Sequence, residues 1–194
     1  ILILFAFIMF GYNFTYSQWS FMLPMQIMKD YPVMGSQYYG FLAGFNGLTV
    51  IIFTPILTRL LGNLPYLRRG VIGGLFYAVG FGMIGVLHSL EFMFLWAFIF
   101  TLGEVVLAIT VSPFIANNTP ASHRGRMTST IGIISDSGYT LGPLGMGMAL
   151  SYISMETGWI VLGLSTLIFT SLMMVLEMRE RKRACQESIK VPAK

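Results

Sequence analysis

A carboxylate lies in the middle of a long apolar run of this sequence. Glu104 sits midway through about 25 apolar residues that follow Glu91. A helix rises about 1.5 Å per residue, so this run can cross the roughly 30 Å hydrocarbon core of a bilayer. An ionised carboxylate there costs about 2.5 kcal/mol or more, so it faces a polar cavity, is paired, or is protonated. We expect Glu104 to be functional; the alternative is a neutral carboxyl that makes only an interhelical hydrogen bond.

The composition of the whole chain agrees with a membrane location. Of the 194 residues, 55% are hydrophobic and 10% are charged, and the mean hydropathy is +0.73. Soluble domains carry about 25% charged residues, so we interpret the chain as an all-α integral membrane protein. Because Ile1 lies inside an apolar run, we interpret the sequence as a fragment. One cysteine and the isolated His88 and His123 give no disulfide or metal framework, so we expect no metal and no cofactor.

Prolines, glycines and charged residues divide the chain into six apolar segments. Each segment is long enough to cross a bilayer as a helix. They cover residues 1–28, 36–61, 69–87, 92–115, 127–153 and 159–176. We therefore predict a six-helix transmembrane bundle over residues 1–178 and a basic cytoplasmic tail over residues 179–194.

Polar side chains recur among these segments with a period of three. Segments one, two, four and five carry them, whereas segment six contains no charge and segment three contains none after its first residue, Arg69. Such a rhythm is typical of transporters built from two inverted three-helix repeats, in which polar helices line a midplane cavity and apolar helices face lipid. The candidate substrate-binding or proton-binding residues are Tyr12, Asn13, Tyr16, Asn46, Glu104 and Asp136.

Two of these candidates have open alternatives. Tyr12 and Tyr16 are four residues apart and share a helix face, which we expect to face water or substrate; the alternative is an interfacial aromatic belt. Asp136 either accepts a proton, pairs with a cation of another part of the protein, or caps a helix break before Gly138. A purely structural role for Asp136 is equally open.

The basic residues predict the orientation in the membrane. Eleven of the twelve Lys and Arg residues fall on one side of the predicted helices, and only Lys29 falls on the other. The positive-inside rule therefore places those loops and both termini in the cytoplasm. The basic residues are spread over short loops, which favours lipid head groups and not nucleic acid as their partner. The candidate residues of a cytoplasmic gate are Arg59, Arg68, Arg69, Arg124 and Arg126.

Several motifs carry a family resemblance. They are Thr101-Leu102-Gly103-Glu104, Pro113, Pro120 with Arg124-Gly125-Arg126-Met127, Tyr16-Ser17-Gln18 with Leu23-Pro24, Gly138 to Gly147 around Gly142-Pro143, and Arg59-Leu60-Leu61-Gly62 with Arg68-Arg69. In this order they resemble helices seven to twelve, the C-terminal half, of a major facilitator superfamily transporter. The similarity is nearest to proton-coupled multidrug antiporters and looser to peptide transporters.

This resemblance implies a transporter and not an enzyme. A substrate path would run between this bundle and a missing N-terminal six-helix half, in the plasma or inner cell membrane. The expected activity is proton-coupled export of lipophilic or cationic small molecules, driven by the proton gradient, with cation and proton competing for Glu104. One alternative is a proton-coupled peptide or amino-acid symporter of the same fold. An alternative of another class is a membrane scaffold subunit without transport.

Overall fold

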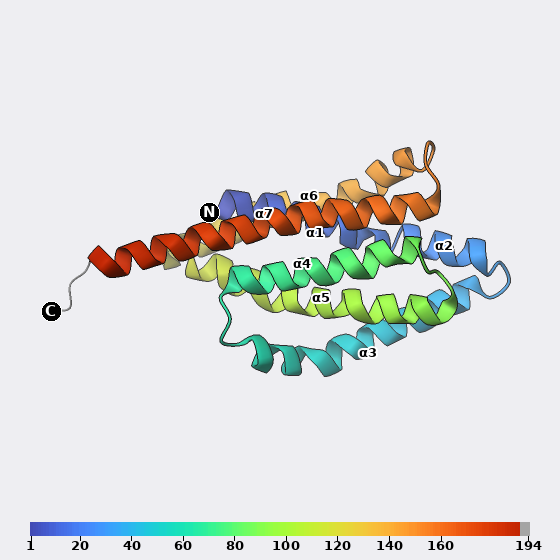
Figure 1. Cartoon of the computed structure of the whole chain (residues 1–194), viewed down its shortest axis with the longest axis horizontal. Helices are drawn as coiled ribbons and strands as arrows, with labels where there is room; N and C mark the ends of the chain where they lie inside the picture. The colour runs from blue at the N-terminus through green and yellow to red at the C-terminus, as the bar shows by residue number, and fades with distance from the viewer. Residues whose placement is uncertain (191–194) are drawn as a thin grey trace.

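The structure, a computed structural model, describes residues 1–190, and every element in that range is helical. The helices run nearly parallel to the long axis of the molecule (Figure 1). The α-helices are α1 Leu2–Tyr16, α2 Met22–Asp30, α3 Gly35–Leu61, α4 Tyr66–Gly82, α5 Leu90–Asn117, α6 Arg124–Ala149 and α7 Met155–Lys190. Short 3-10 turns lie at Ser17–Trp19, Met83–Gly85 and Ala121–His123.

These helices correspond to the six predicted segments, because α1 and α2 together form the first one. Four of the described helices are long and apolar enough to cross a membrane on their own: α3, α4 with its 3-10 turn, α5 and α7. The first segment is broken in two, and α6 carries Arg124, Arg126 and Asp136. The two segments that do not meet this criterion are therefore the first, which is interrupted, and the fifth, which is polar. Interrupted and polar helices are where membrane proteins commonly form binding sites.

The packing of the helices follows the expected three-helix repeat. Helix α1 packs on α6, and its counterpart in the second repeat, α5, packs on α3. In the same way α4 packs on α5, and α7 packs on α1. Exchanging α1 with α5, α3 with α6 and α4 with α7 therefore converts each of these pairs into another of them. This symmetry is what an inverted repeat of three helices requires.

The first segment is interrupted at residues 17–21 and is not one helix over residues 1–28. The side chains of Ser17 and Gln18 both donate to the Phe14 carbonyl, at 2.7 and 3.0 Å, and so satisfy an acceptor that the break would leave free. Pro24 does not cause the interruption, because it is the third residue of α2, where a helix does not use the backbone N–H.

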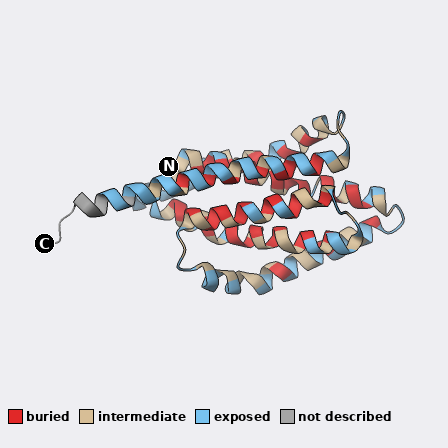
Figure 2. Ribbon diagram, in the orientation of Figure 1, coloured by how far each residue is buried: buried red, intermediate tan, exposed pale blue. Residues whose placement is uncertain are grey.

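Helix α4 is more enclosed than the sequence predicts for a segment facing lipid. In its apolar window 61% of residues are buried, against 11% in α3 (Figure 2). The backbones of α4 and its neighbours approach closely, since a Cβ on Gly80 would lie 2.7 Å from the Phe100 backbone nitrogen and one on Gly163 would lie 2.7 Å from the Gly82 Cα. Glycines thus allow close helix packing around α4, whereas α3 is the least covered of the four long apolar helices.

Helix α7 continues well past the apolar segment predicted over residues 159–176. It begins at Met155 and runs to Lys190, projecting beyond the other helices (Figure 1). Lys, Arg and Glu are good helix formers, and cations suit the C-terminal end of a helix, so the basic cluster does not end it. A boundary at residue 178 therefore falls inside a continuous helix, and the function of residues 179–194 stays a prediction, with residues 191–194 outside the described part.

The loop between α3 and α4 is held by a buried arginine. The Arg69 guanidinium donates to the Leu64 carbonyl at 3.0 Å and to the Gly62 carbonyl at 2.8 Å, and lies 4.8 Å from the centre of the Tyr66 ring. Only 9% of Arg69 is exposed. These contacts indicate a structural role in the loop.

Replacing Arg69 with Met should lower the free energy of unfolding by about 1–3 kcal/mol, because two carbonyls lose a charged donor. Thermal unfolding of the full-length parent protein in detergent measures this change. Arg59→Met is the matched control, since Arg59 is exposed at the end of α3. An equal loss of stability in both variants would contradict the structural role of Arg69.

Candidate functional site

Both intramembrane carboxylates line one cavity of about 330 Å³. Its walls come from α1, α4, α5 and α6. None of the described residues that line it is Lys, Arg or His, so its fixed charges are the two carboxylates. The lining residues are Met9, Asn13, Tyr16, Tyr77, Glu104, Leu107, Ala108, Val111, Ser112, Ile115, Thr128, Ile131, Gly132, Ser135 and Asp136.

Glu104 is held by a side-chain amide from the neighbouring helix. Asn46 of α3 donates through Nδ2 to Glu104 Oε2 at 2.9 Å and to Thr101 Oγ1 at 2.8 Å. Thr101 lies on α5, one turn before Glu104, and donates to the Ala97 carbonyl at 2.6 Å. Because Asn46 uses its amide in this way, the Glu104 carboxylate keeps a fixed orientation towards the cavity.

Asp136 on α6 is held in the same manner. Asn13 of α1 donates through Nδ2 to Asp136 Oδ1 at 3.2 Å and to the Ser135 carbonyl at 3.0 Å. Helices α1 and α6 can approach for this contact because Gly138 and Gly142 lie against the α1 backbone near Phe10 and Phe14. The site residues predicted as Asn13 and Asp136 are therefore brought together by helix packing.

The two pairs are related by the internal repeat. The exchange that converts α1 into α5 and α6 into α3 converts the Asn13 and Asp136 pair into the Glu104 and Asn46 pair, with amide and carboxylate interchanged. The first repeat thus contributes both amides, Asn13 and Asn46, and the second contributes both carboxylates, Glu104 and Asp136. This relation indicates that the four polar side chains form one arrangement.

Aromatic rings form the wall beside Glu104. Tyr16 and Tyr77 are stacked, with ring centres 5.8 Å apart, and Tyr139 is tilted against Tyr16 at 6.2 Å. The sequence analysis misses Tyr77, because the third segment has no charge after Arg69 and no amide. Tyr77 could have been found as the one hydroxyl-bearing aromatic residue in a segment rich in glycine. A negative charge next to stacked aromatic rings suits an organic cation.

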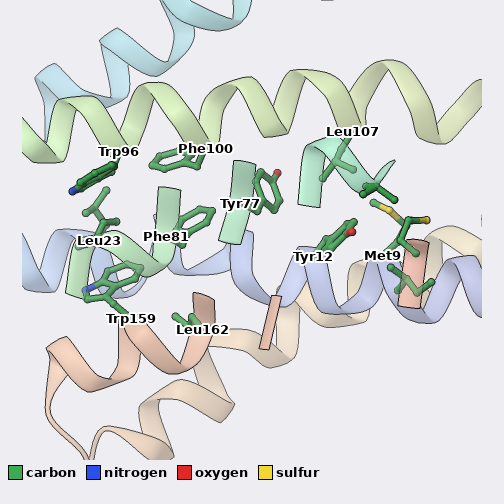
Figure 3. Packing of buried hydrophobic residues seen from close by; sticks show 14 of the residues in the cluster. Met9, Tyr12, Leu23, Tyr77, Phe81, Trp96, Phe100, Leu107, Trp159 and Leu162 are labelled. Carbon is green, nitrogen blue, oxygen red and sulfur yellow. The ribbon is translucent and has the colours of Figure 1, made fainter. Parts of the chain in front are cut away.

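Tyr12 does not join this wall, which corrects the expectation that it faces water or substrate. The side chain is fully buried (Figure 3), and its hydroxyl lies 3.3 Å from both the Gly70 carbonyl and Thr170 Oγ1. The predicted shared face is present, since Tyr12 and Tyr16 both contact the Tyr77 ring. On this shared face Tyr12 points into the packed interior, whereas Tyr16, one turn later, lines the cavity.

Tyr12→Phe should therefore change stability and not transport. We expect a loss of about 0.5–1.5 kcal/mol in the free energy of unfolding, because the hydroxyl loses its partners. The matched variant Tyr16→Phe removes a hydroxyl that interacts with Glu104, and should weaken cation binding to the parent protein. Binding by equilibrium dialysis and unfolding by heat separate the two effects, and weaker cation binding in the Tyr12 variant would be inconsistent with this placement.

The five candidate gate arginines do not form one cluster. Arg68 forms an ion pair with Glu177 of α7 at 3.0 Å, and Arg69 holds the loop already described. Arg124 donates to the Ala116 carbonyl at 3.1 Å, which ties the start of α6 to the end of α5. Arg59 and Arg126 are exposed. A gating role for these five residues stays a prediction.

A second, larger cavity of about 540 Å³ lies apart from this chemistry. It surrounds the Arg68 to Glu177 ion pair and is bounded by Ile1, Tyr66 and Phe114. Its acids are matched by arginines, and neither Glu104 nor Asp136 reaches it. The cavity between the two carboxylates is therefore the candidate site.

An all-helical bundle of apolar helices with two carboxylates in one cavity, the partly buried Glu104 and the exposed Asp136, is typical of a multi-pass membrane protein. The profile of the Major Facilitator Superfamily matches residues 1–191. A solved POT family transporter in complex with a thioalcohol conjugated peptide superposes with a TM-score of 0.76 at 16% identity. The match covers 92% of this chain and 40% of that chain. No curated protein matches the chain.

The chain therefore belongs to the Major Facilitator Superfamily, which is a family of transporters and not of enzymes. At 16% identity the solved structure shows the fold alone. The chain spans 40% of the length of that transporter.

Proposed function

We propose that the chain is the C-terminal six-helix half of a proton-coupled exporter of lipophilic or cationic small molecules. The observation that carries this proposal is the pair of carboxylates in one cavity, with no basic residue among the described residues that line it. In the ionised form they attract a cation, whereas protonation removes that attraction. Proton and substrate then compete for the same groups, and alternating exposure of the cavity to the two sides of the membrane converts this competition into antiport.

A partner half is supported by the surface of α3. Gly40, Gly44 and Gly47 lie on one face of this helix, and a Cβ on any of them would meet nothing within 4 Å. Glycines on the other helices of the bundle mostly meet close neighbours, as at Gly73 and Gly103. In the proposal the N-terminal half covers this face and closes the cavity. The protein lies in the cell membrane with both termini cytoplasmic, and the proton gradient replaces any cofactor.

A second candidate is proton-coupled symport of peptides or amino acids. It is favoured by the superposition on a POT family transporter bound to a peptide conjugate. Glu104 would then bind the amino group of the substrate, and the group that binds the substrate carboxylate would come from the N-terminal half. The cavity described above contains no basic side chain for that purpose, so we favour the cation exporter.

Vesicles that contain the full-length parent protein and an internal pH dye test the proposal. A preformed proton gradient should be released by lipophilic cations and not by dipeptides. Release of the gradient by dipeptides alone would favour peptide symport over cation export. No response to either class, from protein that is folded and correctly inserted, would favour a scaffold without transport.

A further inference from the structure

Ser135 carries a buried hydroxyl that no described residue satisfies. Only 5% of the residue is exposed, its Oγ has no hydrogen-bond partner in the described part of the chain, and it lines the candidate cavity. Two residues later, Ser137 donates to the Ile134 carbonyl at 2.6 Å, as helical serines commonly do. A buried hydroxyl without a partner is costly in a native protein, so this one calls for a ligand.

The neighbouring Asp136 offers a second acceptor on the same wall. Asn13 occupies Oδ1 of this carboxylate. The other oxygen, Oδ2, is 3.9 Å from the position of a Cβ on Gly132, which also lines the cavity. Ser135 and Asp136 are consecutive residues that both line the cavity, so this part of it offers a buried hydroxyl and an exposed carboxylate that can accept hydrogen bonds from a cationic donor.

The part of the cavity around Glu104 has a different chemistry. Around Glu104 the cavity is lined by the stacked rings of Tyr16 and Tyr77. Such a surface binds a flat or delocalised cation, which needs no N–H donor. Asp136 accepts a hydrogen bond from Asn13 and Glu104 accepts one from Asn46. Each carboxylate is therefore oriented by its own amide.

We infer that the cavity is built for substrates with two cationic groups: a protonated amine that binds Ser135 and Asp136, and an aromatic cation that binds beside Glu104. This inference rests on the proposed function, because it assigns the substrate class of the same cavity. It makes Ser135 and Asp136 residues that determine specificity.

Three phenanthridinium probes test the inference. They are identical except for the N-alkyl chain, which is propyl, 3-aminopropyl or 3-(trimethylammonio)propyl. Their affinities are measured by equilibrium dialysis against the full-length parent protein in lipid nanodiscs. The aminopropyl probe should bind at least about tenfold more tightly than the propyl probe, as expected for a charged hydrogen-bonded pair. The trimethylammonio probe should gain less, because it has no N–H donor.

Two variants assign the preference to the proposed residues. Asp136→Asn should remove the advantage of the aminopropyl probe, and Ser135→Ala should reduce it while the trimethylammonio probe is unaffected. Ser137→Ala is the matched control, because Ser137 lies on the same helix and its hydroxyl is already paired. An unchanged circular dichroism spectrum and a single elution peak in gel filtration show that each variant is folded, and Ser135→Ala alone suffices if the aspartate variant does not fold.

Equal affinity for the propyl and aminopropyl probes in the unaltered protein would overturn the inference. So would an amine preference that survives both substitutions. Dialysis needs no proton gradient, so this result is independent of proton-coupled flux. Absence of flux with an intact amine preference would contradict the proposed function alone.

Discussion

Glu104→Gln should reduce proton-coupled cation transport to the level of protein-free vesicles. The amide keeps the size of the side chain and can still accept a hydrogen bond from Asn46, so the bundle should remain folded. It can neither bind a proton nor attract a cation, and both steps of the proposed exchange are lost. The measurement is release of a preformed proton gradient by a lipophilic cation in vesicles with the full-length parent protein.

The control for this substitution lies on the same helix. Glu91 is in the first turn of α5, is exposed, and is hydrogen-bonded to Ser89 Oγ at 3.0 Å. Glu91→Gln makes the identical chemical change outside the cavity and should leave transport intact. Undiminished coupling in the Glu104 variant would assign this carboxyl to interhelical hydrogen bonding only.

Gly138→Ala should destabilise the contact between α1 and α6 and separate Asn13 from Asp136. An added Cβ would collide with the Phe10 carbonyl oxygen and lie 2.9 Å from its carbon. Backbone atoms cannot rotate away as a side chain can, so the helices must move apart, at a cost of about 1–3 kcal/mol. Thermal unfolding in detergent should show a lower midpoint, and cation affinity should fall with it.

Gly147→Ala is the matched control on the same helix. A Cβ there would lie 3.5 Å from the Phe21 ring, an ordinary contact. Alanine also favours a helix over glycine by about 1 kcal/mol, which applies to both positions. Gly147→Ala should therefore leave the unfolding midpoint unchanged or raise it. A similar rise for Gly138→Ala would contradict the close contact between α1 and α6.

The sequence predicts the segments of this fold well but not their ends. Composition and loop residues are local properties, and they place the six segments. The break at residues 17–21 depends on side chains that satisfy the Phe14 carbonyl and on close contact with Gly142, which belongs to a distant part of the chain. The extension of α7 to Lys190 is missed because a basic cluster ends an apolar segment without ending a helix.

For the site, single residues are predictable and their partners are not. Glu104 and Asp136 are noticeable because an acid within an apolar helix is expensive. Their pairing with Asn46 and Asn13 joins positions far apart in the sequence and follows only from helix packing. Tyr12 and Tyr77 show the same limit: a face shared along one helix does not reveal what lies opposite it, so one tyrosine is assigned to the cavity in error and the other is missed.

The most direct test of the account is whether cation binding displaces a proton. The full-length parent protein in detergent is titrated with a lipophilic cation in weakly buffered solution at several pH values between about 5 and 8, and proton release is followed with a pH dye. The account predicts release of up to about one proton per bound cation at some pH in this range, lost in Glu104→Gln. Saturable cation binding without proton release at any of these pH values would contradict it.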